Sequence, residues 1–224
     1  MRPALMIFAA GLGTRMRPLT DNRPKPLIEV AGQTLLDRAL AMGREARLSP
    51  IVVNSHYLGA QIADHLAGQD VAISDESDLL LDTGGGLRKA LPLLGGGPVM
   101  TLNPDVVWSG PNPLAALCEA WDERMDALLA LVPIAAATAR VGGGDFSMDA
   151  TGRLARRGDF VFAGAQIIRP ERLAEIPDRM FSLNRIWDVL IAEGRAFGMI
   201  HRGGWCDVGR PEAIPLAEAL LTDG

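Results

Sequence analysis

The chain has 224 residues, of which 48% are hydrophobic, and no apolar run approaches the roughly 18 residues that a membrane-spanning helix needs. A formal net charge of −5 at neutral pH argues against a broad nucleic-acid-binding surface. The N-terminus shows no signal-peptide pattern, and the two cysteines and three histidines have no metal-ligand spacing, which favours a cytoplasmic protein with free thiols.

Strands and helices are predicted to alternate along the first 134 residues. Short apolar runs typical of buried strands lie at residues 5–10, 51–54, 71–74, 98–102 and 127–134. Helical patterns lie at residues 34–47, where Thr34 can cap the first turn, and at residues 61–66, 87–94 and 114–124. This alternation predicts a Rossmann-like α/β fold, with a mostly parallel, mixed sheet and helices on both faces.

The pattern changes after residue 134. Residues 135–160 are rich in glycine and other small residues. Strands are then predicted at residues 160–168 and 197–200, and helices at residues 182–192 and from Pro211 onward. Because no linker or repeat interrupts the chain, we expect one domain over residues 1–224, with a distinct lobe at roughly residues 135–200.

The first predicted strand runs into a loop that is typical of an anion-binding site. Gly11 and Gly13 allow a tight turn whose N–H groups come close to a ligand, because no Cβ stands in the way. Four cations follow within eleven residues, on a segment stiffened by prolines: Arg15, Arg17, Arg23 and Lys25. A dinucleotide fingerprint would continue into a helix, which Pro18 disfavours, and the P-loop pattern is absent. The loop therefore predicts a polyphosphate site.

Two aspartates stand where ligands bind in open α/β sheets. Asp105 follows the predicted strand at residues 98–102, and Asp207 lies between a predicted strand and the last helix. By itself, Asp105 is better explained as a turn residue and Asp207 as the N-terminal cap of the last helix. Their hard carboxylate oxygens suit Mg²⁺, which also accepts phosphate oxygens as ligands.

The string G-L-G-T-R-M-R-P-L-T-x-x-x-P-K-P, which begins at Gly11, resembles the signature loop of the sugar-1-phosphate nucleotidyltransferases. Three further motifs follow in the order typical of that family: D-T-G-G-G from Asp82, N-x-D from Asn103 and W-x-D-V-G from Trp205. The resemblance covers about residues 3–220. It implies the nucleotide-diphospho-sugar transferase type of fold, in which residues 135–200 form the lobe on the sugar side.

The resemblance also implies roles for individual residues. Arg15 and Lys25 would neutralise phosphate charge during catalysis, and Asp105 and Asp207 would hold Mg²⁺. The residues expected to bind the nucleotide are Ala10, Gly11, Leu12, Gly13, Thr14, Glu76, Thr83, Gly84 and Gly85, with Asp78 as an alternative contact to the base. Those expected to bind the sugar phosphate are Asn103, Gly144 and Asp145 of a G-D-F loop, and Gly164.

The implied activity is transfer of a nucleotidyl group to a sugar 1-phosphate by a monomer or weak dimer. Compact length and the motifs together resemble the branch that uses UTP and N-acetylmuramate 1-phosphate in peptidoglycan recycling. The E-K-P motif of the glucose 1-phosphate branch is absent. Residues 142–144 would leave room for the lactyl group, and either Arg156 or Arg157 could reach its carboxylate.

Other functions remain open at this stage. A mannose-1-phosphate guanylyltransferase or a choline phosphate cytidylyltransferase would have similar motifs. Pro104 stands where the family usually has glycine and removes a backbone N–H, which keeps open a non-catalytic sugar-nucleotide sensor subunit. Ala163 stands where relatives often carry a hydroxyl. Retention of both aspartates and of Lys25 favours an enzyme.

Overall fold

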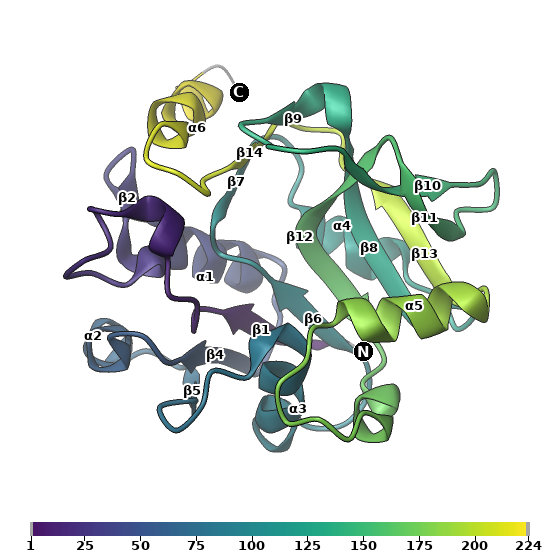
Figure 1. Ribbon diagram of the computed structural model, residues 1–224, viewed down its shortest axis with the longest axis horizontal. Coiled ribbons are helices and arrows are strands. Elements are labelled where there is room, and N and C mark those ends of the chain that lie inside the picture. Colours follow the sequence, from purple (N-terminus) through teal and green to yellow (C-terminus); the bar gives the residue numbers. More distant parts are fainter. Residues whose placement is uncertain (1, 223–224) are drawn as a thin grey trace.

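In the computed structural model, residues 2–222 are described, and a nine-stranded mixed sheet forms their centre (Figure 1). The strands are β1 (Ala4–Phe8), β2 (Glu29–Val30), β3 (Gln33–Thr34), β4 (Ile51–Ser55), β5 (Ala72–Asp75), β6 (Val99–Leu102), β7 (Val106–Trp108), β8 (Ala127–Pro133), β9 (Ala137–Thr138), β10 (Gly144–Met148), β11 (Leu154–Gly158), β12 (Phe160–Ile168), β13 (Ala196–Ile200) and β14 (Trp205–Asp207). The α-helices are α1 (Leu35–Glu45), α2 (Gly59–Leu66), α3 (Asp82–Leu94), α4 (Pro113–Ala120), α5 (Asn184–Ala192) and α6 (Ala213–Thr222). Four short 3₁₀ turns complete the described elements: η1 (Thr14–Met16), η2 (Lys25–Leu27), η3 (Ile134–Ala136) and η4 (Glu171–Glu175).

The N-terminal half of the chain builds the parallel part of the sheet. The strands lie in the order β6-β1-β4-β5, and every neighbouring pair is parallel. Leu5 of β1 is paired with Ile51 on one side and Met100 on the other. Because parallel strands end at the same edge, the loops that follow β1, β4, β5 and β6 meet there, where open α/β sheets bind ligands.

Apolar side chains of β1 alternate between two cores, as the pleat of a strand requires. Leu5 and Ile7 pack in one cluster with residues of α1, α2 and α4. Met6 packs in a second cluster with residues of α3 and α5. Helices therefore cover both faces of the sheet, and the predicted Rossmann-like α/β fold is confirmed (Figure 1).

The sheet divides at β12. Along one side β12 pairs with β8, which in turn carries β13. Along the other side its first residue pairs with β10, whereas its last residues pair with β6. The pairing of β12 with β8 shifts register between Phe162 and Gln166, where Gly164 has φ +94°. This irregular stretch lies where β12 passes from β10 to β6 as its partner on the other side. Strands β6 and β10 consequently pair with different parts of β12 and leave a space between their ends.

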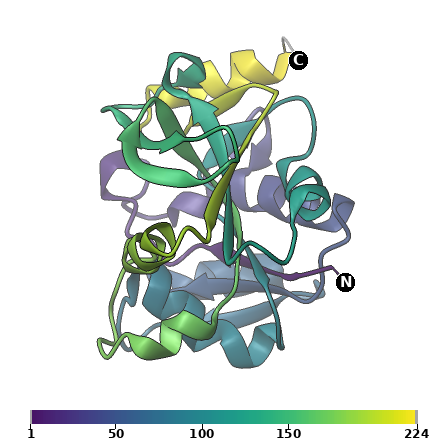
Figure 2. The ribbon, with the colours of Figure 1, turned by 90° about the vertical axis from the view of Figure 1, so that its right-hand side faces the viewer.

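A small sheet in the order β7-β14-β9 brings the two aspartates to one place. Asp207 of β14 pairs with Val106 of β7, and the N–H of Val208 donates to the carbonyl of Asp105 at 2.9 Å. Helix α6 packs against β14 and β7 (Figure 2), and an apolar cluster that includes Val107 and Cys206 holds this arrangement.

Several elements differ from the sequence-based expectation. Strands β7, β9, β10 and β11 are not predicted from periodicity. The G-D-F run expected as a loop is the start of β10, because its pairing with β11 brings Gly144 against the carbonyl of Gly158, where no Cβ fits. The helix expected over residues 114–124 ends at Ala120, since Trp121 is extended. None of the helices in the described part of the chain combines the length and apolarity that crossing a membrane requires.

Candidate active site

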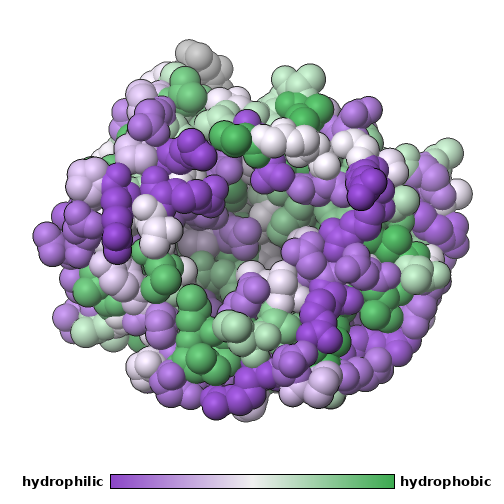
Figure 3. Space-filling view, viewed as in Figure 1, coloured by the Kyte–Doolittle hydropathy of each residue, from purple (hydrophilic) through white to green (hydrophobic). Residues whose placement is uncertain are grey.

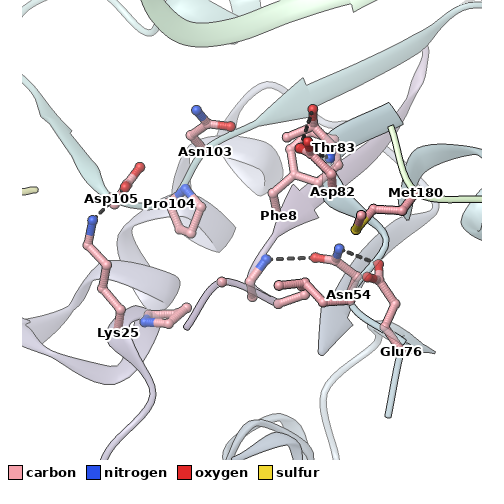
Figure 4. A pocket seen from close by; sticks show the side chains of 15 residues that line it. Phe8, Lys25, Asn54, Glu76, Asp82, Thr83, Asn103, Pro104, Asp105 and Met180 are labelled. Carbon is pink, nitrogen blue, oxygen red and sulfur yellow. Dashed lines mark hydrogen bonds and ion pairs between the residues drawn. The ribbon is translucent and has the colours of Figure 1, made fainter. Parts of the chain in front are cut away.

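A cavity of about 420 Å³ opens at the carboxyl edge of the parallel strands. It corresponds to the hollow near the centre of the face in Figure 3, and its lining is drawn in Figure 4. We call it the first cavity. Its lining residues are Phe8, Ala9, Ala10, Gly11, Lys25, Pro26, Asn54, Glu76, Leu80, Asp82, Thr83, Asn103, Pro104, Asp105 and Met180.

A buried polar network supports the first cavity. The N–H of Ala9 donates to Asn54 Oδ1 at 2.7 Å, and Asn54 Nδ2 donates to Glu76 Oε1 at 2.6 Å (Figure 4). The other carboxylate oxygen of Glu76 accepts from the N–H of Leu81 at 3.0 Å. Glu76 is 0% exposed, so these bonds satisfy a carboxylate that would otherwise be costly to bury. The network fixes the end of β1 relative to β4, β5 and α3.

The two glycines of the loop after β1 meet different surroundings. A Cβ on Gly11 would meet no atom within 4 Å, and Gly11 lines the first cavity. Gly13 has φ +63°, and its Cβ would lie only 3.0 Å from the side chains of both Lys25 and Thr20. Of the predicted nucleotide contacts in this loop, Ala10 and Gly11 face the cavity, whereas Leu12 is 43% exposed and, like Gly13 and Thr14, lies outside its lining.

Lys25 and Asp105 form an ion pair at the rim of the first cavity. Lys25 Nζ lies 2.6 Å from Asp105 Oδ2, and the Lys25 side chain is only 11% exposed (Figure 4). Lys25 lies in η2 between two prolines, which limit the conformations of the segment that presents it. The ammonium group is therefore positioned beside the predicted metal ligand.

Asp207 lies next to this pair, in a neighbouring cavity of about 380 Å³ that Arg15 and Arg140 also line. Burial raises the pKa of the Asp207 carboxyl, and the charge of Asp105 raises it further, while Lys25, Arg15 and Arg140 oppose the increase. Within residues 2–222 no group of three or more His, Cys, Asp or Glu side chains is placed to hold a metal ion. Asp105 and Asp207 lie close enough for their charges to repel each other.

A second cavity of about 300 Å³ lies where β6 and β10 separate along β12. We call it the sugar-side cavity. Its lining residues are Phe8, Asp82, Thr83, Thr101, Asn103, Arg140, Asp145, Arg156, Phe162, Gln166, Ser182, Leu183, Asn184 and Trp187. Phe8, Asp82, Thr83 and Asn103 line this cavity and the first one, so two ligands bound in them would meet at these four residues.

The predicted sugar-phosphate residues have distinct positions around this cavity. Asp145 accepts from Arg140 Nη2 and from the N–H of Phe162, each at 2.9 Å. Asn103 donates its N–H to the carbonyl of Gly164 at 2.8 Å, and a Cβ on Gly164 would lie 3.2 Å from that of Asn103. Asp145 and Asn103 line the cavity, Gly164 supports Asn103, and Gly144 lies outside the lining.

The D-T-G-G-G run forms the first turn of α3. The N–H groups of Gly84 and Gly85 donate to the carbonyl of Phe181 at 2.9 and 3.1 Å. A Cβ on Gly84 would collide with the ring of Phe181, and one on Gly85 with the carbonyl of Arg179. These glycines therefore allow close packing, and Thr83 is the residue of the run that lines both cavities together with Asp82.

Sequence reasoning missed several lining residues. Asn54 lies one residue before the end of β4, and a polar residue at that position is the signal that could have revealed it. Arg140 and Trp187 carry no motif, and only the folded chain brings them beside Asp145 and Phe162. Met180, 60% exposed, comes to the first cavity from the segment before α5.

Comparisons with known proteins agree with this geometry. Residues 5–146 match the family model of the MobA-like NTP transferase domain. An N-acetylmuramate alpha-1-phosphate uridylyltransferase of Caulobacter vibrioides is 41% identical, over 97% of this chain and 96% of its own length. A protein of the same name from Neisseria meningitidis is 35% identical over 96% of each chain. A mannose-1-phosphate guanylyltransferase of Mycobacterium tuberculosis is 27% identical, over 98% of this chain and 64% of its own length.

Solved structures share the fold at lower identity. HddC from Yersinia pseudotuberculosis, crystallised with GMP-PN, has a TM-score of 0.76 and 18% identity, with 98% of this chain and 99% of that chain covered. A putative glucose-1-phosphate thymidylyltransferase from Bacillus anthracis has a TM-score of 0.82 and 16% identity, with 99% and 96% covered. At these identities the likeness establishes the fold alone.

A glycine loop beside a cavity at the carboxyl edge of a parallel sheet is the arrangement of a nucleotide-binding α/β protein. The chain belongs to the MobA-like NTP transferase family, and it is a nucleotidyltransferase. The resemblance to sugar-1-phosphate nucleotidyltransferases, inferred from the glycine loop and the later motifs, is confirmed.

Proposed function

We propose that the protein transfers a uridylyl group from UTP to N-acetylmuramate 1-phosphate, giving UDP-N-acetylmuramate and pyrophosphate in peptidoglycan recycling. The observation that carries this proposal is the likeness, at 41% and 35% identity over 96% of their lengths, to two proteins named for that activity. The two cavities, which share Phe8, Asp82, Thr83 and Asn103, suit a reaction between two bound substrates.

The nucleotide would occupy the first cavity and the sugar phosphate the sugar-side cavity. An oxygen of the sugar phosphate attacks the α-phosphorus of UTP and forms a new O–P bond, while the bond between the α-phosphorus and the bridging oxygen breaks and pyrophosphate leaves with the electron pair. The attacking oxygen is already ionised near neutral pH, so no general base is required. Positioning and charge neutralisation remain as the sources of catalysis.

Named residues supply both effects in this proposal. Gly11 admits the phosphates close to the backbone, because nothing lies within 4 Å of the place its Cβ would take. Lys25 and Arg15 neutralise the triphosphate and the departing pyrophosphate. Glu76, held by Asn54, fixes the wall against which the base would lie. Asn103, at the junction of the cavities, positions the sugar phosphate.

The donor set at Asp105 and Asp207 fits Mg²⁺. Two carboxylates are too few for a closed metal site, but Mg²⁺ is commonly held by one or two carboxylates together with water and substrate phosphates. Burial raises the pKa of Asp207 and the charge of Asp105 raises it further, and a divalent cation would neutralise the charge of these two carboxylates. When bound, Mg²⁺ would supply positive charge to the α-phosphate and the sugar phosphate. Lys25 would then exchange its bond to Asp105 for contact with the triphosphate.

The substrates of the proposed reaction favour a cytoplasmic location, because UTP and sugar phosphates are intracellular metabolites. We further propose that the enzyme acts apart from nucleic acid and membrane, as a monomer or weak dimer. A mannose-1-phosphate guanylyltransferase is the second candidate, supported by the 27% identical relative from Mycobacterium tuberculosis.

A coupled assay of pyrophosphate release tests the proposal. Purified protein with Mg²⁺ is given each pair formed from UTP, GTP or CTP and N-acetylmuramate, N-acetylglucosamine, glucose or mannose 1-phosphate, and choline phosphate is added to the panel of acceptors. We expect the highest kcat/KM for UTP with N-acetylmuramate 1-phosphate. A higher value for GTP with mannose 1-phosphate would reassign the substrates, and no turnover with any pair would favour a sensor subunit.

A further inference from the structure

We propose that Arg156 binds the carboxylate that distinguishes N-acetylmuramate from N-acetylglucosamine and so selects the acceptor. This inference rests on the proposed function, since it names the group on the protein that reads the acceptor's lactyl substituent. It follows from the positions of the cations around the sugar-side cavity. Sequence left Arg156 and Arg157 as equal candidates, and the structure separates them.

Two of the residues that line the sugar-side cavity are cations, Arg140 and Arg156. Arg140 also lines the neighbouring cavity with Asp207, and its charge acts on the Asp207 carboxyl, so it lies at the end where the phosphates would meet. Arg156 instead contacts α5, through Asp188 and the carbonyl of Asn184. An acceptor whose phosphate lies near Asp207 and Asn103 would therefore direct its ring substituents toward Arg156.

The guanidinium group of Arg156 is held in place before any ligand arrives. Its Nε donates to Asp188 Oδ1 at 2.7 Å, and its Nη2 donates to the carbonyl of Asn184 at 2.9 Å. Its Cζ lies 5.0 Å from the ring centroid of Phe146 and 5.5 Å from that of Trp187, both within the range of cation–π attraction. A cation fixed in this way loses little side-chain entropy when it binds an anion.

Arg156 retains the capacity to bind a carboxylate. A guanidinium has five N–H donors, and the bonds to Asp188 and Asn184 use one at Nε and one at Nη2. The Asp188 side chain is 61% exposed, so water screens its attraction for Arg156. Nη1 enters no hydrogen bond among residues 2–222, which leaves its donors for a ligand.

The neighbouring arginine serves as a matched control. Arg157 follows Arg156 on β11, but its φ of +67° interrupts the regular strand geometry at this position. Arg157 is exposed and lies outside the lining of the sugar-side cavity. Residues 142–144, which were expected to leave room for the lactyl group, also lie outside that lining.

The test compares two acceptors that differ by the lactyl group. With UTP and Mg²⁺, Arg156→Gln should lower kcat/KM for N-acetylmuramate 1-phosphate by about 10–100-fold, mainly through KM, as expected for a lost charge-assisted hydrogen bond. Its kcat/KM for N-acetylglucosamine 1-phosphate should change by less than about threefold, and Arg157→Gln should change neither. Arg156→Lys keeps the positive charge but loses the paired N–H donors of the guanidinium, so it should lower kcat/KM for N-acetylmuramate 1-phosphate to an intermediate degree.

Equal losses for the two acceptors would show that Arg156 only supports the fold, and no loss with N-acetylmuramate 1-phosphate would refute its role. A second measurement separates this inference from the proposed reaction. Calorimetric affinities of both acceptors are measured with a non-reactive UTP analogue present. If the wild type binds N-acetylmuramate 1-phosphate more tightly and Arg156→Gln abolishes only that difference, the inference stands even where turnover fails. If Arg156→Gln is unfolded by circular dichroism, Arg156→Lys provides the same comparison.

Discussion

Lys25 combines burial with a charged partner, and its removal tests the phosphate-binding loop at the scale of one residue. Lys25→Ala is expected to lower kcat/KM by about 10²-fold or more, because a positioned cation at a developing charge contributes several kcal/mol. Steady-state kinetics with saturating Mg²⁺ measure the effect. Arg17→Ala is the control from the same loop, since the Arg17 side chain is 64% exposed and its ion pair is with the exposed Asp21. A loss below threefold for Lys25→Ala would reduce Lys25 to a structural ion-pair partner.

Asp207 should serve activity at the expense of stability. The pKa of Asp207 is raised in the folded protein, mainly by burial. Protonated Asp207 therefore contributes to the free energy of unfolding at acidic pH, and this contribution is lost as pH rises through the pKa that Asp207 has in the folded protein. Asp207→Asn removes the charge with little change of volume. Without divalent metal it should increase the free energy of unfolding at neutral pH by about 1 kcal/mol, and by less at acidic pH.

The same substitution should lower turnover by about 10²–10³-fold, since a charge that orders the phosphates is lost. Urea unfolding at two pH values and the pyrophosphate assay measure the two effects. Wild-type activity at low Mg²⁺ in Asp207→Asn would remove Asp207 from the proposed metal ligands.

At the scale of one element, the loop after β1 uses its two glycines for different purposes. Gly11→Ala should leave the free energy of unfolding within about 0.5 kcal/mol of wild type, because its Cβ meets open space, yet it should raise KM for UTP by about tenfold. Gly13→Ala should cost about 1–2 kcal/mol of stability, since φ is +63° and the new Cβ crowds Lys25 and Thr20.

Chemical denaturation and nucleotide kinetics distinguish the two variants. Loss of stability in Gly11→Ala, or its absence in Gly13→Ala, would contradict the surroundings assigned to these glycines.

At the scale of the whole molecule, the first cavity, where we propose that the nucleotide binds, is lined by residues from Phe8 to Met180, so a bound nucleotide should oppose global unfolding. UTP at about 100 times its Kd with Mg²⁺ should add about 2.7 kcal/mol to the free energy of unfolding. Scanning calorimetry should record this as a Tm increase of several degrees. The increase should shrink when EDTA replaces Mg²⁺, and it should shrink equally in Asp207→Asn. A Tm increase that is independent of metal would contradict joint binding of nucleotide and cation.

The sequence by itself determined those features that local patterns encode. Residues 51–54 and 160–168 carry mainly apolar side chains, and each lies in a strand of the sheet. Thr34 caps α1 through the N–H of Asp37, as its position predicts. The long glycine-loop string from Gly11 and the later motifs were enough for the resemblance to the family, because these motifs are contiguous in sequence.

Only the tertiary structure decided what depends on residues far apart in sequence. Glycine is required in the first turn of α3 because the segment around Phe181, about 100 residues away, packs against it. The division of the sheet at β12 determines which residues line the sugar-side cavity. The choice between Arg156 and Arg157 depends on which of the two side chains packs against Phe146 and Trp187. Strands β10 and β11 are short and half-exposed, so their pairing rather than their hydrophobic pattern makes them strands. Long-range packing fixes these contacts, and local sequence patterns do not record them.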